Sequence, residues 1–265
     1  AETFARKRGM TEIIGNFNLT AMQALGIVTD GFEHAPYTGQ VYNPSHIPDL
    51  LEANGYMRTF PTRTFDVDLA EADSRLLSQE RVKQRFREED IEWRQLQKKN
   101  FKPLMRDACD VLNASFSDRP MFVPMNHDEF LFQTQDMRWS LDSRLSFLAY
   151  ESNQPVAVML CMPDTNPLLH KTRSRVGLTT PWHYMRHRKQ GKRASIICTS
   201  VIPEFRRQGI ATTMLVRLMR ALKGIGYERM GMSWVGDDNE PMLRLVETLR
   251  GRPHHRLHLF RKVLA

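Results

Sequence analysis

Residues 203–212, PEFRRQGIAT, combine the residue types that proteins use to hold a phosphate group. Arg206 and Arg207 supply two positive charges, and Gly209 stands where a helical repeat of apolar residues begins. The start of a helix leaves backbone N–H groups unpaired and carries partial positive charge, so it can bind an anion. Because glycine has no Cβ, an anion can approach the backbone closely at Gly209. This stretch therefore predicts a phosphate-binding turn.

The flanking residues predict the two elements that would position this turn. Ser195 to Ile202 is short, apolar and rich in β-branched residues, as is typical of a buried strand. After Gly209 the spacing of apolar residues becomes helical and gives a single apolar stripe. Gly224 and Gly226 are expected to end that helix. The predicted order is strand, polar turn over 203–208, and helix.

The spacing Arg206-x-x-Gly209-x-Ala211, preceded by Val201-x-Pro203, resembles the pyrophosphate-binding loop of the GNAT acyltransferases. In that family the loop holds the pyrophosphate of acyl-coenzyme A, and the end of the preceding strand hydrogen-bonds the pantetheine arm. An asparagine at the start of a later helix contacts the same arm. The resemblance thus implies acetyl-CoA or another acyl-CoA as cofactor. The implied binding residues are Thr199, Ser200, Val201, Arg206, Arg207, Gln208, Gly209, Ile210, Ala211, Thr212 and Asn239.

Candidate catalytic groups precede that later helix. Asp237 and Asp238 could accept a proton from an attacking amine, although carboxylates also favour helix starts for electrostatic reasons alone. No base is spaced to activate Thr199 or Ser200, so direct transfer to an amine is favoured over an acyl-enzyme. Many GNAT enzymes carry a tyrosine seven residues after the asparagine, which protonates the leaving thiolate. This chain has Val246 there, which leaves open a catalytically silent module.

Composition narrows the class of protein. The chain has 265 residues, 41% of them hydrophobic, and no apolar run near the roughly 18 residues that a membrane span requires. The three cysteines are unclustered, which indicates buried thiols in a reducing cytoplasm and no zinc site. His255 and His258 would point to opposite faces of a strand, which is poor metal geometry, so no metal is expected.

The formal net charge of +8 indicates affinity for anions. The basic residues of 171–193 are expected to form a solvated loop, because the aromatic platform of single-strand nucleic-acid binders is absent.

From about residue 90 the expected order is strand, helix, helix, two strands, insertion, strand, helix, strand, helix, strand. This is the GNAT order, and it implies an α/β (α+β) GNAT fold with a mixed, mostly antiparallel sheet flanked by helices. The sheet is expected to splay where the strand ending at Ile202 meets the strand from Glu228. The pantetheine arm would insert there, and the insertion over 163–193 would shape the acceptor entrance.

The order of elements at the N-terminus repeats at the C-terminus, which suggests an internal duplication. Residues 1–70 are interpreted as the C-terminal half of a degenerate GNAT-like repeat, 71–89 as a linker helix and 90–265 as the acyl-CoA-binding domain. The chain is then expected to be a fragment of a longer protein. The segments MFVPMNHDEFLF and SWVGDDNEPMLRLVETL resemble a bacterial group of tandem GNAT-like proteins. A half-copy would expose a sheet edge, which a homodimer is one way to cover.

The sequence therefore favours an acyl-CoA-dependent N-acyltransferase that moves an acetyl or longer acyl group to a small-molecule or peptide amine by direct attack. The alternative is a catalytically silent GNAT-like module that binds CoA or a carrier protein. A third hypothesis, nucleic-acid binding through 171–193, ranks last. Release of free thiol from acetyl-CoA separates the first hypothesis from the second.

Overall fold

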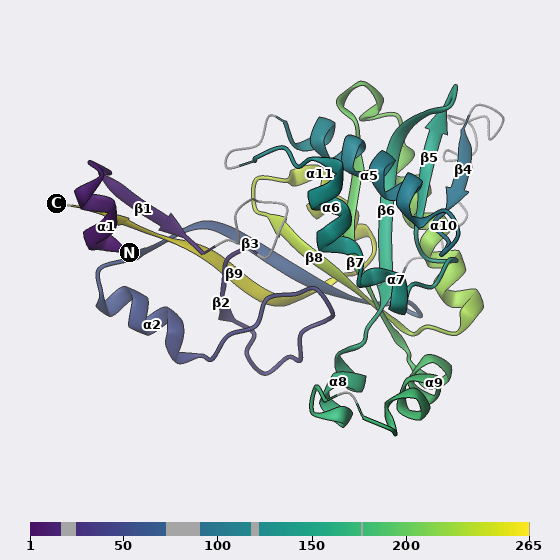
Figure 1. The fold of residues 1–265 in the computed structure, drawn as a ribbon, viewed down its shortest axis with the longest axis horizontal. Helices are drawn as coiled ribbons and strands as arrows, with labels where there is room; N and C mark the ends of the chain where they lie inside the picture. Colours follow the sequence, from purple (N-terminus) through teal and green to yellow (C-terminus); the bar gives the residue numbers. More distant parts are fainter. Residues whose placement is uncertain (17–24, 73–90, 118–121, 176, 265) are drawn as a thin grey trace.

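The computed structural model describes residues 1–16, 25–72, 91–117, 122–175 and 177–264. Their strands form one nine-stranded sheet in the order β1-β9-β3-β8-β7-β6-β5-β4, with β2 beside β9 (Figure 1). Only β7 and β8 run parallel, which confirms the expected mixed, mostly antiparallel sheet. The strands are β1 (Glu12–Gly15), β2 (Ile27–Asp30), β3 (Met57–Asp68), β4 (Glu92–Gln95), β5 (Phe147–Glu151), β6 (Gln154–Pro163), β7 (Arg193–Val201), β8 (Arg229–Gly236) and β9 (Arg252–Val263).

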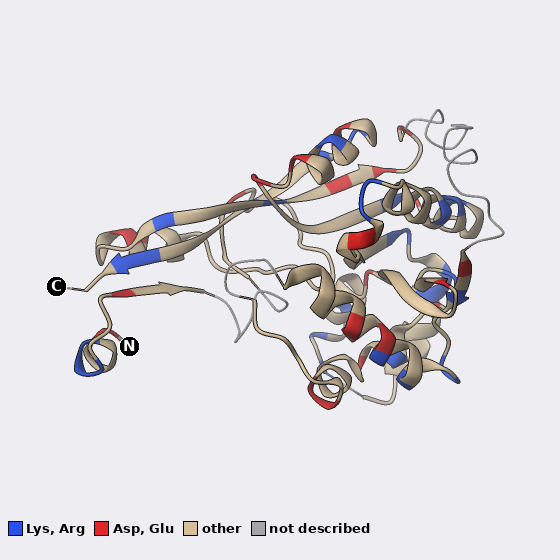
Figure 2. Ribbon diagram, turned by 90° about the horizontal axis from the view of Figure 1, so that it is seen from above, with Lys and Arg blue, Asp and Glu red and all other residues tan. Residues whose placement is uncertain are grey.

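Helices cover both faces of the sheet: α5 and α6 lie on one face, and α10 and α11 on the other (Figures 1 and 2). The helices are α1 (Glu2–Lys7), α2 (His46–Ala53), α5 (Phe101–Phe116), α6 (His127–Thr134), α7 (Met137–Ser140), α8 (Asn166–Thr172), α9 (Thr180–Gln190), α10 (Ile210–Ile225) and α11 (Glu240–Thr248). None of the helices in the described residues is long and apolar enough to cross a membrane.

The core explains why α5 and α10 form where they do. Each has 16 residues and one apolar stripe, which includes Leu104 and Ala108 on α5 and Met214 and Leu218 on α10. These four side chains are at most 7% exposed and pack in one cluster with β5, β6 and β7. Burying a side chain of leucine or methionine size contributes roughly 1.5–3 kcal/mol. The two stripes thus fix the helices against the sheet.

Three local predictions from the residue pattern are wrong. Residues 125–139, with Asn126 as a plausible cap, predict one helix, but the structure has two, α6 and α7; the Thr134 hydroxyl donates to the Phe130 carbonyl at 2.7 Å, a contact that often bends helices. Residues 18–45, which are rich in Gly, Pro and Asn, predict a loop, but they contain β2. The solvated loop expected within 171–193 belongs to an insertion that forms α8 and α9, each with a proline in its first turn.

Strands from the two ends of the chain interleave in the sheet. β3 lies between β8 and β9, and β9 lies between β3 and β1, with all of these pairs antiparallel. The far ends of β3 and β9 project with β1 and α1 away from the rest of the molecule, and both chain termini lie at the tip of this extension (Figures 1 and 2). The linker helix expected over 71–89 lies almost entirely outside the described residues.

Candidate active site

The predicted cofactor residues gather around one cavity of about 750 Å³. The end of β7, the following turn, the start of α10 and one face of α11 form its walls. Ten of the eleven predicted binding residues, all but Gln208, line this cavity. The candidate base Asp238 lines it as well. Gln208 instead donates its side-chain amide to the Glu204 carbonyl at 3.0 Å and so closes the turn. The structure thus brings the sequence-predicted set together.

The cavity opens because β7 and β8 part. They pair only from Arg193 to Ile196 on β7 and from Arg229 to Met232 on β8. The Ser233 hydroxyl donates to the Ile196 carbonyl at 2.8 Å at the point where the strands separate. Past this point every residue from 197 to 201 is only partly buried. The expected splay is present, and it leaves an edge of backbone groups to face a ligand.

A bulge on β7 lies at the start of the splay, and no residue pattern predicts it. Cys161 pairs with Ile196 and Leu160 with Cys198, so Ile197 has no residue opposite it on β6. A bulge bends its strand and leaves the extra residue outside the ladder. Its position at the strand separation places it where a ligand arm would enter.

The turn before α10 has the geometry of an anion-binding site. Gly209 is the N-cap of α10 and has a φ of 90°, and Arg207 has a φ of 62°. No side chain caps the start of this described helix, so its first N–H groups face the cavity without a side-chain acceptor. Backbone turns of this kind direct successive N–H groups towards one point. The turn has the strand, turn and helix order expected from the sequence, and its binding of a pyrophosphate stays a prediction.

The two arginines of the turn have different surroundings. Arg206 donates to the Ser115 carbonyl at 2.6 Å and to the Val201 carbonyl at 3.4 Å, so it ties the turn to α5 and β7. Arg207 is exposed, and within the described chain it forms no hydrogen bond or ion pair. Both line the cavity. Arg207 is therefore the charge more available to a phosphate.

The start of α11 forms the opposite wall. The Asn239 side chain accepts from the Met242 N–H at 3.4 Å, so this residue caps the helix and lines the cavity at the same time. Sequence reasoning missed the other wall residues of α11. They share one helix face through the spacing i, i+3, i+4 and i+7, a signal that was present in the sequence. They are Pro241, Met242, Arg244, Leu245 and Thr248.

The two candidate catalytic aspartates differ in position. Asp238 lines the cavity, whereas Asp237 does not. The Asp237 carboxylate accepts from Arg256 at 2.6 Å and from Arg63 at 3.0 Å. Partial burial acts to raise the pKa of Asp237, but the bonds from these guanidiniums outweigh it and hold the pKa below its usual value. Asp237 is thus a weak base that joins β8 to β3 and β9, and Asp238 is the better placed of the two.

Val246 faces the core. Its side chain is 2% exposed, belongs to the main hydrophobic cluster and does not line the cavity. The described lining residues include no tyrosine, cysteine or histidine. A group that protonates a leaving thiolate is therefore absent from the described wall, in agreement with the departure seen in the sequence.

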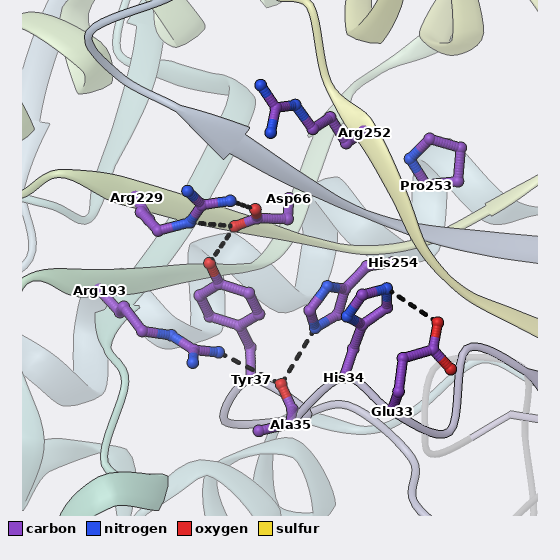
Figure 3. Close-up of a pocket in the computed structure, with 10 residues that line it drawn as sticks. All are labelled: Glu33, His34, Ala35, Tyr37, Asp66, Arg193, Arg229, Arg252, Pro253 and His254. Atoms are coloured by element: carbon purple, nitrogen blue, oxygen red, sulfur yellow. Dashed lines mark hydrogen bonds and ion pairs between the residues drawn. The ribbon is translucent and has the colours of Figure 1, made fainter.

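A loop from the N-terminal segment covers the splay from the other side. Figure 3 shows the cavity of about 370 Å³ beside it, where Tyr37 donates to Asp66 and Arg229 pairs with the same carboxylate. The Tyr37 ring lies over Gly231 of β8, where a Cβ would collide with it. The Gln40 side chain donates to the Met232 carbonyl at 3.1 Å. The loop that contains Tyr37 and Gln40 thus packs against β8 where β8 begins to separate from β7.

Arginines line this smaller cavity, but each is paired. Arg193 pairs with Asp164 at 3.1 Å and Arg252 with Glu71 at 2.7 Å, while Arg229 pairs with Asp66. Such balanced pairs hold elements together and leave little net charge for a ligand. No cluster of metal-ligating side chains occurs in the part of the chain that the structure describes. Burial raises the pKa of the Cys198 thiol on β7 to about 12, so this thiol is a poor nucleophile.

Comparison with known proteins assigns the family. The model of the acetyltransferase (GNAT) family matches residues 105–251, more than half of the chain. A bacterial ceramide synthase from Caulobacter vibrioides is 24% identical over the whole chain and 70% of its own length. A GCN5-related N-acetyltransferase from Sphaerobacter thermophilus has the same fold, with a TM-score of 0.54, 17% identity, and coverage of 86% of this chain and 58% of the other. A tandem GNAT protein from the clavulanic acid biosynthesis pathway superposes on the whole chain and 67% of its own, with a TM-score of 0.54 and 11% identity.

The chain thus spans 58% to 70% of the length of these three proteins. The matched range holds most of α5, the separated ends of β7 and β8, the turn before α10, and α11, so it contains the cavity and its walls. The fold and the site agree with the family match, and this chain belongs to the GNAT family of acetyltransferases.

Proposed function

We propose that the chain is an N-acyltransferase that binds acyl-CoA in the 750 Å³ cavity and transfers the acyl group directly to an amine. One observation carries this proposal: the uncapped start of α10, with Arg206 and Arg207, borders the same cavity as the separated ends of β7 and β8. The first feature suits a pyrophosphate. The second suits an extended arm that needs backbone partners.

Acyl-CoA supplies an activated thioester, which an amine can attack directly to give an amide and a free thiol. The chain contributes mainly position, because holding an amine against the thioester removes much of the barrier. Asp238 is the side chain on the cavity wall that can accept the proton released by the amine. The described wall offers no acid for the departing thiolate, so we assign that proton to water.

We propose a lipid amine as the acceptor. The Caulobacter relative is described as a ceramide synthase, and a ceramide is an amide between a fatty acid and a long-chain amino alcohol. The acyl donor is then a long-chain acyl-CoA, for which the partly exposed residues 197–201 offer a path between β7 and β8. A small-molecule or peptide amine with acetyl-CoA is the competing choice within the same reaction class.

We also propose that residues 1–70 are half of a first GNAT-like copy and that the two copies exchange their last strands. The interleaving of β3 and β9 supports this, because β3 follows β1 in the first copy as β9 follows β8 in the second. The similarity to a tandem GNAT protein agrees with it. The edge strand β1, which pairs only with β9 among the described strands, is where we expect a homodimer or a further segment to pair.

The test of the reaction is release of free thiol and formation of amide with acetyl-CoA and palmitoyl-CoA, each against three amines. The amines are a long-chain amino alcohol, a short amino alcohol and a lysine peptide. Turnover limited to the long-chain pair supports the lipid proposal, and turnover with acetyl-CoA and a short amine contradicts it. Acyl-CoA binding without turnover on any amine would favour the silent-module alternative.

A further inference from the structure

The insertion between β6 and β7, residues 164–192, carries most of the net charge of the chain: seven basic residues and one acidic residue give +6 of the total of +8. Residues 165–193 contain eight lysines and arginines and no aspartate or glutamate. A charge of one sign on 29 consecutive residues is a local electrostatic feature with a range of about one Debye length, roughly 10 Å.

Several of these basic residues are exposed and form no ion pair within the described chain. Lys192 pairs with Glu228 at 3.0 Å and Arg193 with Asp164, so these two are balanced. By contrast, five exposed basic residues form no ion pair within the described chain. They are Lys171, Arg173, Arg175, Arg186 and Lys189.

The same insertion exposes large apolar side chains. The exposed fractions are 103% for Leu178, 62% for Met185, 57% for Trp182 and 45% for Leu169. None of the residues of α9 is buried. Polar contacts hold this helix: His187 bonds the Asp164 carbonyl at 2.8 Å, and Tyr184 donates to the Trp139 carbonyl at 2.9 Å. The structure thus leaves Trp182 and Met185, three positions apart, on the outer face of α9.

Exposed apolar residues with a tryptophan, close in sequence to lysines and arginines that form no ion pair within the described chain, have the chemistry of an interfacial membrane contact. We propose that α8, α9 and Leu178 form a docking surface for an anionic phospholipid bilayer. Leu178, Trp182 and Met185 would enter the interface, and the basic residues would face lipid phosphates. An acidic protein surface would match the charge, but charge alone does not call for four apolar side chains held in water.

The orientation of the insertion agrees with this use. Figure 1 shows α8 and α9 beyond the end of the sheet where β7 begins, and the phosphate-binding turn follows the other end of β7. The nine residues of β7 span roughly 25–30 Å. Docking through the insertion would therefore leave the entrance for water-soluble acyl-CoA facing away from the bilayer. This surface does not depend on which amine is acylated.

The experiment is flotation of the full chain with vesicles of phosphatidylcholine alone and of equal parts phosphatidylcholine and phosphatidylglycerol. An apolar variant combines Leu178→Ser, Trp182→Ser and Met185→Ser, and its control combines Leu50→Ser and Phe132→Ser, which are exposed at 55% and 75%. A charge variant combines Lys171→Gln, Arg173→Gln and Arg175→Gln, and its control combines Lys7→Gln, Arg8→Gln and Arg250→Gln, all exposed.

The wild type should bind anionic vesicles about tenfold or more tightly than neutral ones, and added salt should reduce this binding. Both insertion variants should lose about tenfold or more in vesicle affinity, while the two controls and acyl-CoA binding by every variant stay unchanged. Absence of wild-type binding, or equal loss in controls and insertion variants, would overturn the proposal. So would retention on an acidic protein matrix by a wild type that ignores vesicles. Unchanged acyl-CoA binding separates this outcome from failure of the proposed reaction.

Discussion

The Arg206 guanidinium donates to the backbone carbonyl of Ser115 at 2.6 Å, a contact across 91 positions of the chain. It joins the turn before α10 to the end of α5 and so fixes the orientation of the turn. Arg207, its neighbour, has no such partner among the described residues. We therefore propose that the two adjacent arginines have separable roles: Arg206 positions the turn, and Arg207 binds the charge of the ligand.

This separation predicts different effects of the two substitutions. Arg207→Gln should weaken acyl-CoA binding about five- to tenfold with little change in the free energy of unfolding, because it removes one charge-assisted contact. Arg206→Gln should lower the free energy of unfolding by about 1–2 kcal/mol as well, because the Ser115 carbonyl loses a donor. Calorimetric titration and denaturant unfolding measure the two quantities. Equal effects of both variants on stability would contradict the assignment.

Substitutions of the two aspartates before α11 should also have different effects, one on catalysis and the other on stability. Asp238→Asn is expected to lower kcat by about 10²- to 10⁴-fold with little effect on acyl-CoA binding, because it removes the proposed base. Asp237→Asn should instead lower the free energy of unfolding at neutral pH by about 1.5–3 kcal/mol, because Arg63 and Arg256 lose their charged partner. Steady-state kinetics and urea unfolding check this pair. Full activity of Asp238→Asn would remove that residue from the mechanism.

Replacing Val246 by the tyrosine that many GNAT enzymes carry should raise neither the stability nor the kcat of this protein. Val246→Tyr places a larger side chain in a position that is 2% exposed and faces the core. Overpacking of this kind costs about 1–3 kcal/mol. We expect a lower melting temperature and no rise in kcat for thiol release. A tyrosine variant with normal stability and faster turnover would show that this position reaches the cavity.

Stability should fall as the solution becomes mildly acidic. Burial lowers the pKa of His254, His255 and His258 below the ordinary value, so the unfolded chain takes up protons at a higher pH than the folded one. The free energy of unfolding should therefore be highest above about pH 6.5 and decrease as the pH falls below it. Urea unfolding between about pH 7.5 and 5.5 measures the slope.

The variant that isolates this effect is His255→Gln. Its imidazole contacts the Thr64 hydroxyl at 3.2 Å and the His34 carbonyl at 3.0 Å, so the variant should be less stable at pH 7.5 but lose less on acidification. His46→Gln, at an exposed position, is the control and should keep the wild-type slope. A wild-type free energy of unfolding that rises as the pH falls would contradict this prediction.

The sequence predicted those parts of the site that follow from local chemistry. Gly209 and the apolar stripe after it depend on backbone freedom and helical period, which neighbouring residues determine. The bulge at Ile197 and the pairing of Asp237 with Arg63 depend on contacts between distant segments, for which a single sequence holds no signal. The insertion is the intermediate case. Pro167 and Pro181 are typical of the first turn of a helix, but the many basic residues of 171–193 favoured a solvated loop.

The position of β3 between β8 and β9 could not be predicted from neighbouring residues either. The duplication could be suspected from the repeated order of elements, yet nothing near β3 indicates that it pairs with β8. Pairing partners in a sheet are set by the global packing of faces, and a pattern of alternation is compatible with either neighbour.

The most direct test of the central claim, that the turn at Gly209 binds the pyrophosphate of acyl-CoA, is a calorimetric titration of acyl-CoA into wild type, Gly209→Asp and Gly226→Asp. The two glycines lie at opposite ends of α10 with φ values of 90° and 95°, so the variants carry a similar backbone cost. Gly226 has no atom within 4 Å of an added Cβ, and it does not line the cavity. We predict binding by wild type and Gly226→Asp, and loss of binding by Gly209→Asp. Equal affinity in all three proteins, or no binding by folded wild type, would contradict the account.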